Sequence, residues 1–369
     1  MLLSPSRWVP ISLTSNLKSR AFAVMAITTS SSSLSPPLSS LTASELAPYL
    51  EQVKRCNRGK GERATFVPFL VDNVTVGYIH PSDSVEQNLE VVWPHTLDMS
   101  CKRSFVQHLL PFSKVFDVRR GKTDDYESES LANTYVTLHE GLQSQQDRTE
   151  SVNKCLKFLS DGGIIPGWRD EMYPVVNSFG AAQFFSLERA AVPYFGTKAY
   201  GVHINGFSVD KMGRKYLWVA RRSMTKQTFP GMLDHVVAGG QPVGLSCREN
   251  VIKECNEEAG IPMEIAERAL PVSAVSYEDV DFVRLKRDVL FCYDLELPMD
   301  FKPYNQDGEV DSFNLLPISE VEKILRESEA YKPNCALVVI DFLIRHGYVT
   351  PDQTGYLQLF SSLRQGDCL

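Results

Sequence analysis

Three glutamates occupy one face of a predicted helix in the second half of the chain. Glu254, Glu257 and Glu258 stand at spacings i, i+3 and i+4, and at about 100° per residue these positions share one side of an α-helix. Like charges at this spacing repel each other and weaken the helix. A hard divalent cation such as Mg²⁺ or Mn²⁺ would turn this repulsion into binding, because such cations prefer carboxylate oxygens. The spacing alone is also typical of a solvated acidic surface.

The residues around the glutamates predict a glycine loop that leads into a capped helix. The loop contains Gly239 and Gly240. Ser246 and Glu249 have the spacing of a capping box at the start of the helix, and Gly260 supplies its stop. An apolar stripe that can pack against a sheet runs beside the glutamates and consists of Val251, Cys255 and Ala259. A glycine loop directly before an acidic helix favours a metal site over a merely solvated surface.

Residues 239–261 resemble the Nudix hydrolase signature, in which a glycine and five residues precede a glutamate, and seven more residues precede Arg-Glu-apolar-x-Glu-Glu-x-Gly-apolar. The matching positions are Gly239, Glu254, Cys255, Glu257, Glu258, Gly260 and Ile261. Two positions differ, because Leu245 replaces the first glutamate of the signature and Lys253 replaces its arginine. In the family these two residues interact and orient the loop and helix, whereas the later glutamates hold the metal.

This resemblance implies hydrolysis of a phosphoanhydride with Mg²⁺ or Mn²⁺ as the cofactor. The implied metal ligands are Glu254, Glu257 and Glu258. A bound cation polarises phosphoryl oxygens and lowers the pKa of a bound water. The general base is one of the helix glutamates, with Glu257 and Glu258 as the candidates, or Glu309 in the loop at residues 307–313. A surface turn is the alternative interpretation of Glu309.

Basic and aromatic residues supply candidates for substrate binding. Arg221 and Arg222 follow a predicted strand and could offset the charge of an anionic substrate, although a solvated strand end explains them equally well. Trp168 in the N-terminal half and Tyr277 in the C-terminal half are candidates for stacking on a heterocycle. Further candidates of the two kinds are Lys226, Tyr173, Phe184 and Phe282. Most aromatic residues in a globular protein belong to its core.

The substrate is suggested by a narrower resemblance. Residues 167–175, 184–207 and 238–246 resemble plastid-targeted plant Nudix hydrolases that carry an N-terminal domain of unknown function. That group removes a phosphate from damaged thiamine diphosphates, such as the oxy- and oxo-thiamine forms. ADP-ribose, a nucleotide sugar or a dinucleotide is the alternative small-molecule diphosphate. Leu245 and Lys253 leave open a third interpretation, a catalytically weak Nudix-fold binding module.

The first 44 residues differ in composition from the remainder of the chain. They contain many serines, three basic residues (Arg7, Lys18 and Arg20) and no acidic residue before Glu45. A Ser-rich, acid-free start is typical of an organellar transit peptide, and abundant serine favours the chloroplast over the mitochondrion. A disordered tail is the alternative. Met25 could also start a cytoplasmic form.

Composition and patterning set the remaining expectations. The chain has 369 residues with a net charge of −7, which argues against a general nucleic-acid binder. Its longest apolar stretch, residues 335–344, is too short to span a bilayer. We expect an α+β domain of unknown function at residues 45–198, a Nudix domain at 199–348 and a tail at 349–369. The resemblance implies an α/β/α sandwich with a mixed sheet for the Nudix domain.

Individual elements are also expected from local patterns. Strands are predicted at residues 200–209, 215–221, 235–238, 289–295 and 310–315, and a hairpin is predicted to turn at Asp72 and Asn73. Helices are predicted at residues 151–159 and 334–346. Capping-box spacings predict two further helix starts, one at residues 42–45 and one at Ser319 with Glu322. The eight cysteines include no CxxC pair, which argues against a cysteine-only zinc site.

Overall fold

The computed structural model describes residues 44–81, 105–120, 134–306 and 308–366. All of them belong to one unit, residues 43–369. The predicted transit peptide therefore lies outside the described residues, apart from Ser44.

The central feature is a mixed sheet in the order β11-β12-β7-β8-β13, with β10 paired to β7 and β9 paired to β8. Its strands are β7 (Lys198–Val209), β8 (Lys215–Arg222), β9 (Leu233–His235), β10 (Val237–Gly240), β11 (Leu270–Asp281), β12 (Arg284–Glu296) and β13 (Val310–Pro317). β12 and β7 run parallel, and the other pairs are antiparallel. The mixed sheet expected from the sequence is confirmed.

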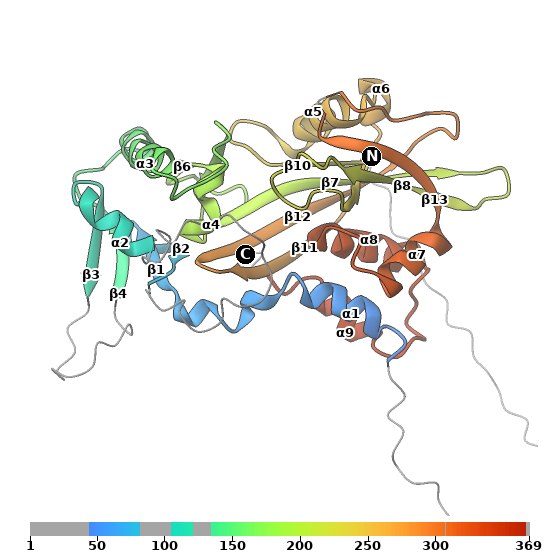
Figure 1. Ribbon diagram of the computed structural model, residues 1–369, viewed down its shortest axis with the longest axis horizontal. Helices are drawn as coiled ribbons and strands as arrows, with labels where there is room; N and C mark the ends of the chain where they lie inside the picture. The colour runs from blue at the N-terminus through green and yellow to red at the C-terminus, as the bar shows by residue number, and fades with distance from the viewer. Residues whose placement is uncertain (1–43, 82–104, 121–133, 307, 367–369) are drawn as a thin grey trace, which may run out of the picture. The chain divides into compact units, whose positions relative to one another are not determined.

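Helices cover both faces of this sheet (Figure 1). The elements are α5 (Cys247–Ala259) and α6 (Met263–Ala266) on one face, and α1 (Ala47–Lys54), α7 (Ile318–Glu327), α8 (Pro333–Arg345) and α9 (Tyr356–Ser362) on the other. Side chains alternate between the two faces along each strand. Trp218 accordingly belongs to the hydrophobic cluster under α5, while its neighbours Leu217 and Val219 belong to the cluster under α8. The result is the expected α/β/α sandwich.

The N-terminal region has its own sheet, in the order β2-β1-β4-β3, and its own hydrophobic core. Its elements are β1 (Val67–Val71), β2 (Val74–Ile79), α2 (Phe105–Leu109), β3 (Phe116–Arg120), β4 (Thr134–Leu138), α3 (Gln145–Asp161), β5 (Met172–Val175), β6 (Phe185–Glu188) and α4 (Val192–Phe195). The predicted hairpin turn is confirmed, because Asp72 and Asn73 both have positive φ between β1 and β2. Although α1 precedes this region in the chain, it packs against α7, α8 and α9.

Two predicted helix starts are wrong. The cap residue of α7 is Pro317 rather than Ser319, and it makes no side-chain cap bond. The cap residue of α1 is Leu46, and the Ser44 hydroxyl instead donates to the Thr354 carbonyl, at 2.6 Å. A proline in the first turn of α1 fixes the helical φ without a capping side chain.

The strand predictions need two corrections. The strand expected at residues 235–238 is divided at Val236 into β9 and β10, which pair with different neighbours. No strand is predicted from the sequence at β11, which carries the buried acids Glu278 and Asp279. Arg63 and Arg58 pair with these acids from a distant part of the chain. The described residues contain no helix that is both long and apolar enough to cross a membrane.

Candidate active site

Helix α5 begins and ends as its sequence predicts. The capping box is formed: the Glu249 amide donates to Ser246 Oγ at 3.2 Å, and the Ser246 amide donates to Glu249 Oε2 at 2.8 Å. At the other end, Gly260 has a φ of 59°, and its amide bonds back to the Asn256 carbonyl. The predicted apolar stripe is buried. These local features fix the direction in which the three glutamates leave the helix.

Strand β10 brings the glycine loop against two of these glutamates. A Cβ atom on Gly239 would lie only 2.3 Å from the Glu254 Cδ atom, so a larger residue there would displace the Glu254 side chain. One residue earlier, the Ala238 amide donates to Glu258 Oε2 at 2.8 Å. Neighbouring residues of β10 therefore contact two glutamates of the signature: Gly239 contacts Glu254, and Ala238 binds Glu258.

The carboxylates of α5 lie in an environment that favours a cation. Burial raises the pKa of Glu254, and it raises the pKa of Glu258 well above the usual value, with further contributions from neighbouring acids. Lys253 Nζ lies 3.0 Å from Glu254 Oε1 and 2.8 Å from Glu257 Oε2. An ammonium group thus stands between two of the three carboxylates that the sequence analysis assigns to a metal.

Leu245 and Lys253, the two positions that differ from the signature, cannot form an ion pair with each other, because leucine carries no charge. Lys253 pairs with the acids of its own helix. Two buried amides anchor the loop instead: Gln241 Nε2 donates to the Leu245 carbonyl at 2.6 Å, and Asn250 Nδ2 donates to the Gly240 carbonyl at 2.7 Å. Neither amide is predicted from the sequence, because Gln241 lies in the loop and Asn250 lies one turn before Glu254 on the glutamate face of α5.

Glu309 lies within electrostatic reach of the helix glutamates. Its charge contributes to the raised pKa of Glu258. Its Oε1 atom is 2.5 Å from Lys226 Nζ. Partial burial alone would raise the pKa of Glu309, but the hydrogen bond to Lys226 and the charges of Lys226, Arg222 and Arg169 together outweigh burial, and the pKa is lowered. The fold therefore brings Glu309 near Glu258 and holds it in the ionised form.

The two candidate arginines hold a turn. Arg222 donates to the carbonyls of Thr228 and Phe229 and pairs with Asp234 Oδ2 at 2.8 Å. Arg221 donates to the Gly231 carbonyl at 2.8 Å. Their bonds fix residues 228–231, where Phe229 has a positive φ of 52°.

The two candidate aromatic residues lie in different surroundings. Trp168 packs at the edge of the N-terminal core and donates through Nε1 to Asp170 at 2.7 Å. Tyr277 is buried, and its hydroxyl donates to Asp288. Asp288 lines a cavity, whereas Trp168 and Tyr277 are not among the described residues in its wall.

That cavity, of about 230 Å³, lies beside the glycine loop. Its charged and polar wall residues include Arg189, Lys286, Asp288, Lys332 and Asn334, and Ala238, Gly239 and Gly240 complete the side next to α5. The N-terminal region contributes Arg189 and Tyr173, and the Tyr173 hydroxyl fills the place where a Cβ of Gly240 would be. No sequence signal marked Arg189, because only the fold brings it to the glycine loop.

The match to known proteins decides the family. The NUDIX domain family matches residues 200–335, and a domain of unknown function, DUF4743, matches residues 100–199. Nudix hydrolase 20, chloroplastic, of Arabidopsis thaliana is 48% identical over 327 residues, which cover 88% of this chain and 80% of that protein. The chain is a Nudix hydrolase. Nudix hydrolase 24, chloroplastic, of the same plant is 46% identical over 326 residues, with the same coverage.

These relatives support the function of this Nudix hydrolase at the level of its family. It belongs to a family of enzymes that act on phosphoanhydrides. The expected chloroplast location is confirmed by the names of both relatives. Among solved structures, DR0079 of Deinococcus radiodurans is similar over 46% of this chain and 98% of its own, at 20% identity and a TM-score of 0.33.

Proposed function

We propose that this Nudix hydrolase is a Mg²⁺- or Mn²⁺-dependent diphosphatase of thiamine-diphosphate-like compounds, including the oxy- and oxo-thiamine forms. Cleavage of the phosphoanhydride would give the monophosphate and phosphate. The observation that carries the proposal is the cavity beside the glycine loop. It offers cations for a diphosphate, Arg189 and Lys286, and a carboxyl group, Asp288, for a heterocycle with basic nitrogens. Such a pairing of charges suits a substrate with an anionic tail and a nitrogen-rich ring system.

The helix glutamates fit the divalent cation that Nudix enzymes generally use. Glu254, Glu257 and Glu258 would hold it, since a cation already bridges two of them in the form of Lys253. When bound, the cation neutralises phosphate charge and lowers the pKa of a water. Among the candidate bases Glu257, Glu258 and Glu309, the pairing with Lys226 keeps Glu309 ionised but lowers its pKa and weakens it as a base, whereas burial raises the pKa of Glu258 toward the range that suits a general base.

The cavity also positions the substrate in this proposal. Arg189 lies within electrostatic reach of Glu254, so a phosphate group held by Arg189 would lie next to the carboxylate cluster. The Tyr173 hydroxyl, packed against Gly240, closes the side of the cavity that the N-terminal region forms. The N-terminal region would then select the substrate while α5 supplies the hydrolytic chemistry.

A comparison of substrates tests this proposal. The purified protein is assayed with Mg²⁺ and with Mn²⁺ against oxythiamine diphosphate, thiamine diphosphate, ADP-ribose, a nucleotide sugar and a dinucleotide, and the products are separated by chromatography. We expect the highest kcat/KM for a thiamine-type diphosphate. A higher kcat/KM for ADP-ribose or a dinucleotide would contradict a thiamine-type substrate and favour that other substrate class.

A binding module without catalysis is the competing function, because Leu245 and Lys253 replace two residues of the signature. Retention of all three helix glutamates supports an enzyme instead. Binding of a thiamine-type diphosphate without turnover, under conditions where the metal also binds, would favour the module.

A further inference from the structure

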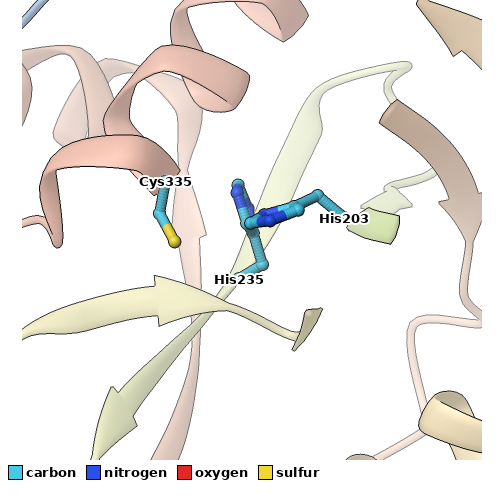
Figure 2. A group of neighbouring side chains, drawn as sticks. All are labelled: His203, His235 and Cys335. Carbon is cyan, nitrogen blue, oxygen red and sulfur yellow. The ribbon is translucent and has the colours of Figure 1, made fainter. Parts of the chain in front are cut away.

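A second group of side chains suited to a metal lies outside the glutamates of α5. His203 on β7, His235 on β9 and Cys335 on α8 offer ligand atoms that all lie within 4.8 Å of one another. Figure 2 shows the two imidazole rings next to each other, edge to face, with the Cys335 sulfur near them. All three residues are buried. Three elements that are separate in sequence thus bring one sulfur and two imidazoles to one point.

The histidines carry ring nitrogens that lack a partner. Within the described part of the chain, His203 Nδ1 and His235 Nε2 are buried and make no hydrogen bond. Each residue is only 4% exposed. Burial lowers the pKa of His235 to about 4 and that of His203 well below its usual value, so both rings are neutral. A buried polar atom without a partner is costly, and a neutral imidazole is the form that binds metals.

Asp234 holds the thiol of the group in place as an outer partner, and its Oδ1 atom also accepts from the His235 amide at 2.8 Å. Cys335 Sγ donates to Asp234 Oδ1 over 2.7 Å. Arg222 at 2.8 Å and Lys332 at 3.6 Å hold the other carboxylate oxygen, Oδ2, and so orient Oδ1 toward the thiol. Outer partners of this kind commonly fix the orientation of metal ligands.

We propose that His203, His235 and Cys335 bind a zinc ion that joins β7, β9 and α8, with Asp234 as the outer partner of Cys335. Two nitrogens and one sulfur, with a water molecule in the fourth position, are a donor set typical of Zn²⁺, and His203 lines the cavity from which water could reach that position. The magnesium site proposed on α5 is different in kind, because it offers oxygen ligands alone.

The charges of this binding step balance locally. Zn²⁺ would take the place of the Cys335 thiol proton, which passes to solvent, and the resulting thiolate and the nearby Asp234 carboxylate would offset the charge of the dication. The cations beside Asp234 are themselves near acids: Lys332 is within electrostatic reach of Glu258, and Arg222 is within reach of Glu309. For Zn–N of about 2.0 Å and Zn–S of about 2.3 Å, the donor atoms need to approach by about 1 Å.

Metal analysis of the full chain tests the site. The protein is treated with Zn²⁺, desalted and analysed by mass spectrometry for metal content, and we expect about one tightly bound zinc per chain. Replacement by Co²⁺ should give a sulfur-to-cobalt charge-transfer band in the near ultraviolet. A wild-type protein that is folded by circular dichroism, yet retains no zinc and shows no such band, would overturn the proposal.

Matched variants assign the metal to these ligands. Cys335→Ala and His235→Asn should lose the zinc and the cobalt band. Cys292→Ala removes another fully buried thiol and should keep both. Because Cys335→Ala could perturb folding, each variant is compared by circular dichroism, and His235→Asn provides an independent substitution. Zinc that is lost in Glu254→Gln but kept in Cys335→Ala would place the metal on α5 and refute the second site.

Discussion

The Glu254 carboxylate lies against the backbone of Gly239, so closely that a Cβ atom on Gly239 would be 2.3 Å from Glu254 Cδ. A side chain at the first glycine of the Nudix signature would thus collide with a glutamate fifteen positions later in the chain. The glycine permits the approach of β10 to α5, and that approach buries the carboxylate and raises its pKa.

Gly239→Ala should therefore impair both stability and catalysis. The methyl group would push Glu254 or the strand aside, and overpacking of this kind costs about 1–3 kcal/mol. Displacement of the carboxylate should also lower kcat by about tenfold or more. Thermal unfolding and steady-state hydrolysis measure the two effects. Gly61→Ala is the matched control, because a Cβ there meets no atom within 4 Å; equal effects of the two changes would refute the argument.

Neutral substitutions of the helix glutamates should weaken metal binding and catalysis together. Glu257→Gln and Glu258→Gln each remove a charged oxygen donor while keeping the side-chain shape, so we expect kcat to fall by about 100-fold, within the range of losses seen when one electrostatic catalytic group is removed. Mn²⁺ affinity, measured by calorimetry, should fall as well. Glu264→Gln on α6, an exposed acid, should change neither quantity. Undiminished hydrolysis in Glu257→Gln would remove this residue from the proposed metal site.

Much of α5 could be predicted from the sequence because its determinants are local. The capping box at Ser246 and Glu249, the stop at Gly260 and the alternation of charged and apolar residues all act within a few positions of the chain. The hairpin at Asp72 and Asn73 is local in the same sense.

The missed features depend on partners distant in sequence. Strand β11 contains Glu278 and Asp279, which look like surface residues until Arg63 and Arg58 neutralise them from a segment more than 200 residues earlier. Arg189 likewise reaches the cavity only because the N-terminal region packs beside the glycine loop. A single sequence records neither pairing.

Arg189→Met should raise KM more than it lowers kcat. Arg189 lines the cavity and is half exposed, so in the proposed function it is available to bind a phosphate group. Loss of one charge-assisted hydrogen bond of about 1.5–3 kcal/mol predicts a KM increase of about tenfold or more. Steady-state kinetics with oxythiamine diphosphate measure this change.

The ion pair between Arg189 and Glu171, at 2.6 Å, provides the control for this experiment. Glu171→Gln removes the pair but keeps the guanidinium group, so KM should stay near the wild-type value. If both variants raise KM equally, Arg189 acts through the local structure and not through the substrate.

The metal-free protein should lose stability as the pH rises above the usual glutamate range. Burial, the largest cause, and nearby acids raise the pKa of Glu254 and, more strongly, of Glu258 in the folded state. Between the unfolded pKa of about 4.3 and these raised values the folded state binds more protons than the unfolded state, so the free energy of unfolding falls with rising pH. Glu258→Gln should flatten this slope, and unfolding curves measured with a chelator from pH 4 upward, at about half-unit steps, would reveal it. Added Mg²⁺ or Mn²⁺ should restore the lost stability at neutral pH, by about 2.7 kcal/mol at a concentration 100 times the Kd. An identical pH slope for the wild type and Glu258→Gln would show that Glu258 is not the group responsible.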